Sequence, residues 1–365
     1  MSKPGILSTC LLILLAGCST ASRRAPIPAT PDWSLAEKNN LPLPELEHVA
    51  EAQQLAPPAG ALPEPFRPDF SSRSETWLPM ERWSREEHAG VWRKIAAAPV
   101  PVFSLSASNG VLVLQTKSLL ARWNGLVFHL GFEPQMAGGQ MFVHALDLEK
   151  NLKPLLRPFD FPGKTNRVIV IDPGHGGRNT GTESVLGQAN EKEFTLDWAR
   201  RLARRLATNG WQVWLTRTND ADISLSNRVA FAEERHADLF LSLHFNSAAP
   251  NREQSGLETY CLTPVGMPST LKRGYEDDAA LVFPNNAFDP ENFLLGMRLH
   301  RALLKESFMA DRGVRRARFL GVLRGQNRPA ILIESGYLSS PREARRIADP
   351  AYREKLAEAV AQALK

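Results

Sequence analysis

The chain of 365 residues is poor in cysteine. It has three, Cys10, Cys18 and Cys261, and the first two lie within the first eighteen residues. Once an N-terminal leader is removed, only Cys261 remains in the folded part, so no internal disulfide framework is available. This excludes the small secreted domains that disulfides stabilise, and the fold must be held together by the packing of its core.

Long hydrophobic runs and a strong charge imbalance are also missing. The apolar stretch at residues 6–15 is shorter than the about 20 residues that span a bilayer, and no second candidate follows it. The 44 Lys and Arg residues and 39 Asp and Glu residues give a net charge of +5. No basic helix or aromatic platform accompanies this charge, which argues against a nucleic-acid partner. A mildly basic surface suits acidic lipid or an acidic wall polymer, although solvated helix faces are the simpler explanation of the arginines.

The N-terminus has the pattern of an export signal. Lys3 precedes the apolar stretch, which ends in Leu-Ala-Gly-Cys at residues 15–18. This ending resembles the lipobox of bacterial lipoproteins, and the resemblance implies a signal peptide at residues 1–18 with a lipid on Cys18. Ser19, and not an aspartate, follows the cysteine. In this it resembles the Gram-negative lipoproteins that are sorted to the outer membrane, where they face the periplasm. An ordinary signal peptide that is cut elsewhere is the alternative.

Two regions precede the large C-terminal one. Residues 19–82 are predicted to be a semi-rigid tether, because ten prolines lie between residues 19 and 69. Residues 83–156 are predicted to form a small α+β domain, with helices at 86–98 and 118–123 and strands at 110–114, 127–130 and 140–146. His129 and His144 each stand alone among apolar residues, which is more typical of core or surface residues than of ligands. The domain could bind wall polymer or hold its neighbour at a set distance.

From residue 167 to 365 the pattern alternates between strands and helices. Strands are predicted at residues 168–171, 212–215, 239–243, 257–262 and 330–333. Helices are predicted at residues 191–207, 226–235, 293–309 and 352–364. Alternation of this kind, with apolar runs buried on both faces, predicts an α/β fold with a largely parallel twisted sheet and helices on both faces.

Polar residues follow three of these predicted strands. His175 comes after the first strand, His244 directly after the third and Glu334 directly after the last, while Glu191 opens the first helix. Ligands of such sheets bind at the carboxyl ends of the strands. Two histidines and one glutamate form a ligand set typical of catalytic zinc. The other glutamate is then left to move protons.

Four motifs carry a family resemblance. Residues 169–177 (Ile-Val-Ile-Asp-Pro-Gly-His-Gly-Gly), 190–192 (Asn-Glu-Lys), 242–246 (Ser-Leu-His-Phe-Asn) and 332–339 (Leu-Ile-Glu-Ser-Gly-Tyr-Leu-Ser) resemble, in order, those of the zinc-dependent N-acetylmuramoyl-L-alanine amidases. Residues 216–220 match the stretch between the second and third motifs. The resemblance covers residues 167–365.

This resemblance implies a hydrolase of the bacterial cell wall. It implies His175, Glu191 and His244 as zinc ligands and Glu334 as the catalytic carboxylate. The implied reaction is hydrolysis of the amide between N-acetylmuramic acid and L-alanine in peptidoglycan. Two alternatives stay open: the same metal site cutting another wall amide or peptide bond, and a wall-binding lipoprotein that has lost catalysis.

The sequence departs from the family pattern in two places. Asn-Thr-Gly-Thr at residues 179–182 stands where relatives commonly have Asp-Pro-Gly-Ala, and none of these positions is an implied ligand. Residues 266–290 form a longer polar excursion, which is read as a surface loop or groove wall. In some amidases an insertion at this place covers the site until a protein activator displaces it, so an activator is a second expected partner.

Three further polar residues and one thiol have weaker assignments. Arg217, Arg328 and Asn246 are candidates for substrate binding, since an arginine pairs well with carboxylates. Both arginines could instead hold structural acids, which is the favoured interpretation. Cys261 is predicted to be a small buried residue and not a nucleophile.

Overall fold

The computed structural model describes residues 76–97, 100–158, 166–187, 189–271 and 277–365. All of these residues belong to one compact unit. The predicted signal peptide, Cys18 and the predicted tether up to residue 75 lie outside the described residues. Within the described ranges, no helix combines the length and the apolar character needed to cross a bilayer.

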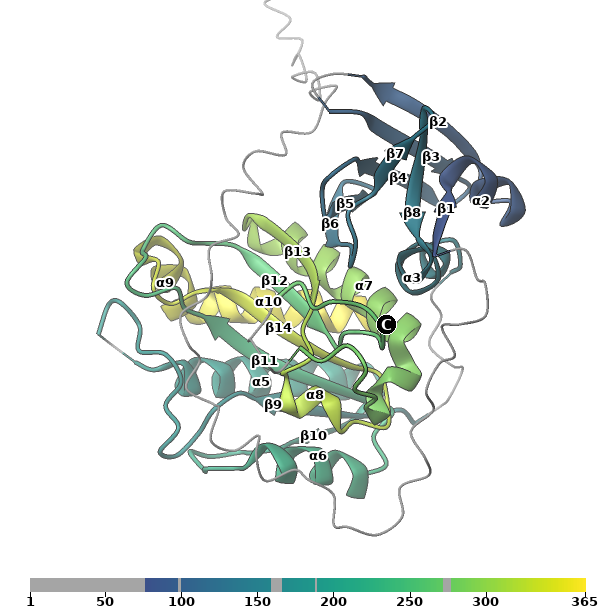
Figure 1. Cartoon of the computed structure of the whole chain (residues 1–365). Coiled ribbons are helices and arrows are strands. Elements are labelled where there is room, and N and C mark those ends of the chain that lie inside the picture. The colour runs from purple at the N-terminus through teal and green to yellow at the C-terminus, as the bar shows by residue number, and fades with distance from the viewer. Residues whose placement is uncertain (1–75, 98–99, 159–165, 188, 272–276) are drawn as a thin grey trace, which may run out of the picture. The chain divides into compact units, whose positions relative to one another are not determined.

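The described residues between 166 and 365 form a mixed sheet with helices on both faces (Figure 1). The strands lie in the order β10-β9-β11-β14-β12-β13. The first four are parallel, β12 runs antiparallel to β14, and β13 runs parallel to β12. Their bounds are β9 (Val168–Pro173), β10 (Gln212–Leu215), β11 (Leu239–Asn246), β12 (Leu257–Cys261), β13 (Asp311–Arg316) and β14 (Ala330–Tyr337). The predicted α/β fold is confirmed, with two strands, β12 and β13, that run opposite to the other four.

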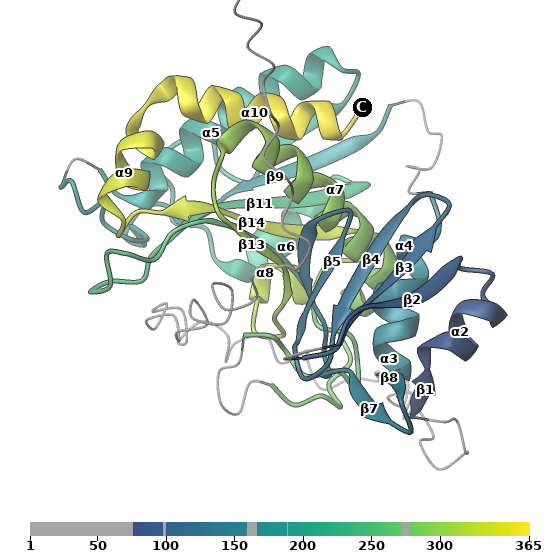
Figure 2. The same ribbon diagram turned by 90° about the horizontal axis from the view of Figure 1, so that it is seen from above.

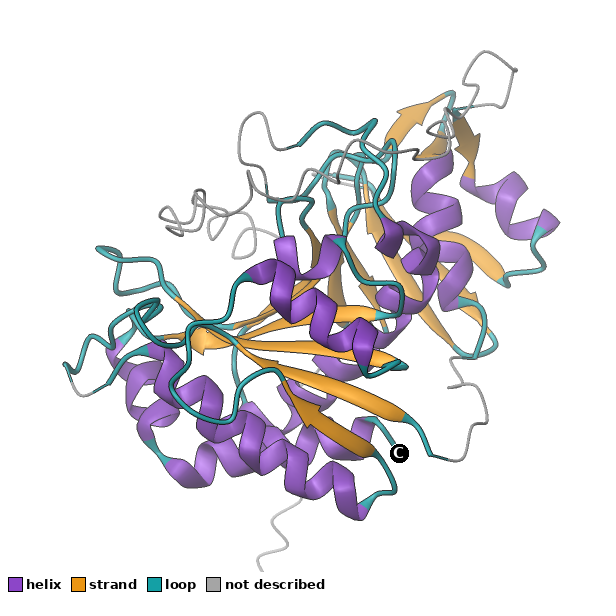
Figure 3. Cartoon of the chain, turned by 90° about the horizontal axis from the view of Figure 1, so that it is seen from below, coloured by secondary structure: helices purple, strands orange, loops and turns teal. Residues whose placement is uncertain are grey.

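The helices form two layers, and the strands lie between them (Figures 2 and 3). One layer consists of α5 (Glu191–Thr208), α7 (Asp289–Ser307) and α10 (Pro350–Ala363). The other contains α6 (Leu225–Glu234) and α8 (Gly321–Arg324). Strand β11 shows why both faces are covered, because Leu241 packs with the first layer and Phe240 with the second. The remaining elements are α9 (Pro341–Ala348) and the 3₁₀ helix η4 (Pro284–Phe288).

Helix α5 follows from a clear sequence pattern. Its buried side includes Phe194, Trp198, Leu202 and Leu206, which recur at helical spacing. At its start, the Asn190 N–H donates to Glu193 Oε2 at 2.6 Å. This cap fixes Glu191 as the first helical residue, at the edge of the sheet where β9 and β11 end.

Residues 77–158, hereafter the N-terminal module, contain two groups of strands. The first is an antiparallel meander of β2 (Val91–Ala96), β3 (Val102–Ala107), β4 (Gly110–Gln115), β5 (Leu120–Trp123) and β6 (Leu126–His129). The second is a three-stranded sheet of β1 (Trp77–Pro79), β8 (Gln140–His144) and β7 (Gln135–Ala137). The helical elements are α2 (Met80–Glu86), α3 (Ala145–Asp147), the π-helix η2 (Leu148–Leu152) and α4 (Lys153–Leu155). Strand β6 pairs with β13, so the meander extends the mixed sheet to eleven strands.

Two helix predictions in this module are wrong. The described residues of the range 86–98 contain the last residue of α2, Glu86, and then β2; between the two elements His88 and Gly90 both have positive φ, which does not continue a helix. Residues 118–123 contain β5, which turns into β6 through Asn124 and Gly125, both with positive φ. Asn-Gly between two apolar runs is a strong hairpin signal. The strands predicted at 110–114, 127–130 and 140–146 correspond to β4, β6 and β8, and the module begins at Trp77, inside the predicted tether.

Candidate metal centre

The end of β9 is fixed by a buried carboxylate. Asp172 accepts hydrogen bonds from Thr216 Oγ1 at 2.6 Å, Ser242 Oγ at 2.9 Å and Arg228 Nη1 at 2.6 Å. Although burial raises the pKa of Asp172, the Arg228 guanidinium brings it below its ordinary value. Asp172 thereby joins β9 to β11, to α6 and to the loop after β10, three residues before His175.

This turn needs glycine on both sides of the histidine. His175 itself has φ +64°. A Cβ on Gly174 would lie 2.2 Å from His244 Cε1, and a Cβ on Gly176 would lie 2.1 Å from the Ala221 carbonyl oxygen. The two glycines therefore allow the His175 turn to approach the end of β11 and the loop after β10.

Arg217 holds the turn against the start of α5. Its Nε donates to the Pro173 carbonyl at 3.0 Å, and its Nη2 donates to the carbonyls of Gly174 and Lys192, each at 2.8 Å. The side chain is buried, and burial lowers the pKa of Arg217 to about 10. These contacts are structural, which was the favoured interpretation of Arg217, and contact with substrate stays a prediction.

His175, Glu191 and His244 come together as predicted. Their potential ligand atoms all lie within 4.8 Å of one another. Glu191 Oε2 is 2.9 Å from His175 Nε2, and Glu191 Oε1 is 2.8 Å from His244 Nδ1. Burial would raise the pKa of Glu191, but the two imidazoles lower it below its ordinary range. Burial likewise lowers the pKa of His175, and the negative charge of Glu191 more than reverses this effect.

Asn179 orients His175, and the sequence did not point to it. Its Oδ1 lies 2.8 Å from His175 Nδ1 and also accepts the Gly181 N–H at 3.3 Å. An oxygen that accepts from a backbone N–H is an acceptor for the ring too, so Nδ1 of His175 carries the proton. The other ring nitrogen, Nε2, faces Glu191 and is the one that would bind a metal ion in place of a proton. The sign of it in the sequence is the departure from the family pattern at residues 179–182.

Glu334 completes the site. It stands opposite His244 in the pairing of β14 with β11, so both side chains leave the same face of the sheet. The residue is 7% exposed, and its Oε2 has no hydrogen-bond partner in the described part of the chain. Burial, with the charges of Glu191 and Glu258 nearby, raises the pKa of Glu334 well above its usual value.

The residues present fit a catalytic metal ion. Two imidazoles and one carboxylate match the set of ligands that catalytic zinc takes, with a position left open for water or substrate. Glu334, whose Oε2 is not bonded to protein, supplies the additional carboxylate that such chemistry needs.

Asn246, Arg328 and Cys261 have protein partners. Asn246 Nδ2 donates to Glu258 Oε2 at 3.0 Å, and its Oδ1 accepts the Ser247 N–H at 2.7 Å. Arg328 pairs with Glu233, a structural acid, as favoured. Contact of Asn246 with substrate stays a prediction. Cys261 is buried as predicted, and burial raises the pKa of its thiol to about 11, so it is not a nucleophile at neutral pH.

The excursion at residues 266–290 is only partly described, since residues 272–276 fall outside the described ranges. Beyond that gap, Asp277 pairs with Arg318 and accepts from Ser269. Asn285 Nδ2 donates to the Arg328 carbonyl at 2.7 Å. These buried contacts fasten both flanks of the segment, and its proposed role as a cover stays a prediction.

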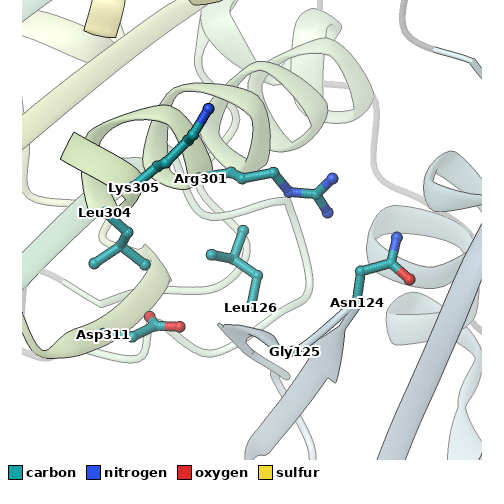
Figure 4. A pocket seen from close by; sticks show the side chains of 7 residues that line it. All are labelled: Asn124, Gly125, Leu126, Arg301, Leu304, Lys305 and Asp311. Carbon is teal, nitrogen blue, oxygen red and sulfur yellow. The ribbon is translucent and has the colours of Figure 1, made fainter. Parts of the chain in front are cut away.

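A pocket of about 550 Å³ lies away from these ligands (Figure 4). It is lined by Asn124, Gly125, Leu126, Arg301, Leu304, Lys305 and Asp311. The Arg301 side chain extends from α7 toward the β5–β6 turn. None of the metal-centre residues is part of this lining.

Residues 169–365, more than half of the chain, match the family model described as N-acetylmuramoyl-L-alanine amidase (Amidase_3). The chain belongs to this family. Among curated members, it is similar to AmiC of Escherichia coli O6:H1 (strain CFT073), with 29% identity over 60% of this chain and 58% of AmiC. It is similar to AmiA of E. coli K12, with 29% identity over 54% of this chain and 74% of AmiA. It is also similar to LytH of Staphylococcus aureus, a probable cell wall amidase, with 32% identity over 56% of this chain and 58% of LytH.

Two solved amidase structures are also similar. One is the N-acetylmuramoyl-L-alanine amidase of Clostridium difficile 630, with 30% identity, a TM-score of 0.46, and coverage of 55% of this chain and 96% of that one. The other is the catalytic domain of CwlV from Bacillus (Paenibacillus) polymyxa var. colistinus, with 28% identity, a TM-score of 0.45, and coverage of 54% and 96%. In the AmiC and LytH comparisons the match spans less than two thirds of the relative's own length.

Proposed function

We propose that this protein is a zinc-dependent amidase that hydrolyses the amide between N-acetylmuramic acid and L-alanine in peptidoglycan. Membership of the amidase family supports the reaction class. The observation that carries the proposal is the site itself: His175, Glu191 and His244 have ligand atoms within 4.8 Å of one another, and Glu334 stands in register beside His244.

The reaction adds water across one amide bond. Zinc bound by the three ligands would polarise the scissile carbonyl and lower the pKa of water to about 7. Glu334 takes a proton from the attacking water and returns it to the nitrogen of L-alanine as the C–N bond breaks. The products are a carboxylate on the lactyl group of N-acetylmuramic acid and a stem peptide with a free α-amine.

The other residues keep the ligands in place. Asn179 holds the His175 ring with Nε2 facing Glu191. The Phe245 N–H donates to Glu191 Oε1 at 3.1 Å, which fixes the carboxylate against the end of β11. Arg217 joins the His175 turn to the start of α5. Ligands placed by partners of this kind need little rearrangement during the reaction.

The test uses the chain from Ser19 onward, incubated with purified peptidoglycan, with and without a chelator. We expect stem peptides that begin at L-alanine in the mass spectrum, lost on chelation and restored by zinc. Glu334→Gln should keep zinc while the rate falls about 10²–10⁴-fold. The exposed Glu253→Gln is the matched control and should have parental activity.

Other outcomes would contradict parts of this proposal. Fragments cut at another bond would be consistent with the metal site but would show that the enzyme hydrolyses a different bond of peptidoglycan. Binding to sacculi without any product would favour a wall-binding protein. Parental activity in Glu334→Gln would remove Glu334 from its role.

We also propose that a lipid on Cys18 anchors the protein in the outer membrane, facing the periplasm. The supporting observation is the sequence Leu-Ala-Gly-Cys-Ser at residues 15–19. In a Gram-negative host, Cys18→Ala should abolish labelling by a radioactive fatty acid and release the protein from the membrane fraction. Cys10→Ala is the matched control, and equal labelling of both variants would contradict the assignment. Displacement of residues 266–290 by a protein activator stays a prediction.

A further inference from the structure

Glu258 in β12 carries a buried charge that the proposed reaction does not use. The residue is 0% exposed. Its Oε1 accepts from Arg312 Nε at 2.7 Å and from Arg315 Nη1 at 2.6 Å. Its Oε2 accepts from the Tyr260 hydroxyl at 2.9 Å and from Asn246 Nδ2 at 3.0 Å. These five residues are hereafter the Glu258 cluster.

The cluster bridges the strand that carries Glu334. Asn246 belongs to β11 and the two arginines to β13, and β14 and β12 lie between these two strands. Glu258 is the cross-strand partner of Glu334, and Glu334 is in turn the partner of His244. Partners on neighbouring strands project from the same face of a sheet. Glu334 therefore stands between a metal ligand on one side and the Glu258 carboxylate on the other.

The N-terminal module supports the cluster from its outer side. Strand β6 pairs with β13 at Phe128 and Val314. His129 Nε2 lies 3.2 Å from the Arg312 carbonyl oxygen, and the Val127 N–H donates to Asp311 Oδ2 at 2.9 Å. Burial, with Arg315 nearby, lowers the pKa of His129 to about 3, so the ring is neutral and donates from Nε2.

Contacts outside the strand pair also fasten the module to the amidase fold. Arg316 Nη2 donates to Asn151 Oδ1 at 3.0 Å, and Lys150 Nζ lies 3.1 Å from Asp289 Oδ2. Figure 4 shows Leu126 of β6 and Asp311 of β13 close to α7. A Cβ on Gly313 would lie 2.8 Å from Val127 Cγ1, so the two strands pack closely. The module is thus an edge of the catalytic sheet.

We propose that Glu258 is a positioning residue for Glu334, and that the N-terminal module holds the Glu258 cluster in place through β6. This inference rests on the proposed amidase function. Arg312 and Arg315 each pair with Glu258 Oε1, so both cations are held toward the Glu258 carboxylate and not toward Glu334. Its Oε2 then remains available to the metal centre. Without the charge of Glu258, the two arginines would attract Glu334 out of its position for proton transfer.

The main experiment is Glu258→Gln in the chain from Ser19, which keeps the shape of the side chain and removes its charge. On a soluble disaccharide peptide we expect kcat to fall about 10–100-fold with KM within about twofold, the pattern of a group that acts only in the transition state. Zinc content should equal that of the parent. Asp289→Asn is the matched control, because it removes another buried, paired carboxylate at the module interface and leaves the cluster intact.

A double variant separates positioning from stability. Adding Arg315→Met to Glu258→Gln removes one of the two cations that would attract Glu334. We expect kcat to recover by about threefold or more, although the double variant loses further buried contacts. A purely structural role for the cluster predicts that the second substitution lowers activity again, which would count against the proposal.

The module has its own arm of the test. His129→Phe removes the donor to the Arg312 carbonyl and should lower kcat on the same soluble peptide by about two- to fivefold, on the scale of one neutral hydrogen bond. A module that only binds wall polymer would change KM on sacculi and leave kcat on the soluble peptide unchanged.

The outcomes separate the two proposals. Suppose that Glu334→Gln is inactive, and that Glu258→Gln and His129→Phe are folded, contain zinc and have the parental kcat. The positioning role is then wrong, and the amidase mechanism stands. Parental activity in Glu334→Gln would overturn both. If Glu258→Gln does not fold, His129→Phe takes its place, because it leaves Glu258 intact and disturbs the cluster only through the Arg312 carbonyl: a two- to fivefold lower kcat supports the positioning role, and parental kcat overturns it.

Discussion

Two pairs of histidines lie in the two halves of the molecule. His175 and His244 belong to the amidase fold, with ring centroids 4.9 Å apart and Glu191 between their nitrogens. His129 and His144 belong to the N-terminal module and serve its own structure. His129 bonds to a backbone carbonyl, while His144 stacks on Phe132 at 3.6 Å and accepts the Leu146 N–H at 3.1 Å.

The difference follows from the direction of the strands. In the amidase half, β9, β11 and β14 are parallel, so their carboxyl ends lie at one edge and bring distant residues together. In the module, β2 to β6 form an antiparallel meander, whose successive strand ends alternate between opposite edges. Residues that follow its strands therefore do not converge, and its histidines become parts of the fold.

The largest effect should come from removing one histidine of each pair. His175→Ala deletes a ligand, so zinc should be lost from the purified protein and hydrolysis of peptidoglycan should fall by at least about 10³-fold. His129→Ala should retain zinc and lose about 1–3 kcal/mol of unfolding free energy, because the buried Arg312 carbonyl loses its donor. Metal analysis and urea unfolding check both. Loss of zinc in His129→Ala would contradict the division between the two halves.

The same contrast explains what the sequence could predict. His175, His244 and Glu334 were found because buried parallel strands are continuous apolar runs, which make the polar residue after each of them conspicuous. Glu191 was found because a helix with one apolar side clearly begins there. The module was predicted less well: short strands in a meander resemble short helices in composition, and the Asn124-Gly125 turn was not recognised.

The sequence pattern does not reveal which side chains contact one another in the fold. Asn179 and Glu258 act through partners that only the fold brings near, four residues away for Asn179 and from 12 to 57 residues away for the Asn246, Arg312 and Arg315 partners of Glu258. Strand β13 was not predicted, because Asp-Arg-Gly-Val-Arg-Arg is too polar to read as a buried strand. Its arginines are buried because Glu258 and Asn151 pair with them.

Two glycines with similar backbone angles allow a second comparison, in which the expected effect is of intermediate size. Gly181, at φ +65°, lies at the metal centre, and a Cβ there would be 2.6 Å from His175 Cδ2 and 2.7 Å from Glu191 Oε2. Gly125, at φ +82°, lies in the β5–β6 turn with nothing within 4 Å of its Cβ position. Both alanine variants have backbone strain of about 1 kcal/mol. Gly181→Ala should also displace two ligands and weaken zinc binding by about 10–100-fold.

Competition with a fluorescent chelator measures this zinc affinity directly. Gly125→Ala should bind zinc as tightly as the parent, and its loss of unfolding free energy should resemble the strain term alone. Equal zinc affinity in the two variants would show that the ligands can move aside at little cost, and the metal centre would then be less rigid than its packing indicates.

The smallest effect concerns two buried carboxylates, one in each half. Burial raises the pKa of Asp147 in the module to about 6, although the Gly131 and Phe132 N–H groups oppose this. Burial also acts to raise the pKa of Glu258, but Arg315 and Arg312 lower it to about 2. The folded state therefore binds the Asp147 proton more tightly than the unfolded state does, and it binds the Glu258 proton less tightly.

The sign of each pH dependence follows from these shifts. Through Asp147, the free energy of unfolding should decrease as the pH rises from about 4 to 6, by at most about 1.4 kcal/mol per pH unit. The contribution of Glu258 is complete above its ordinary pKa and is lost only at lower pH. In urea titrations between about pH 4.5 and 6.5, Asp147→Asn should remove a downward slope and Glu258→Gln should leave the slope unchanged. If Asp147→Asn left the slope unchanged, the Asp147 carboxylate would be ionised in the folded module and held by its three donors, the N–H groups of Gly131 and Phe132 and Asn151 Nδ2.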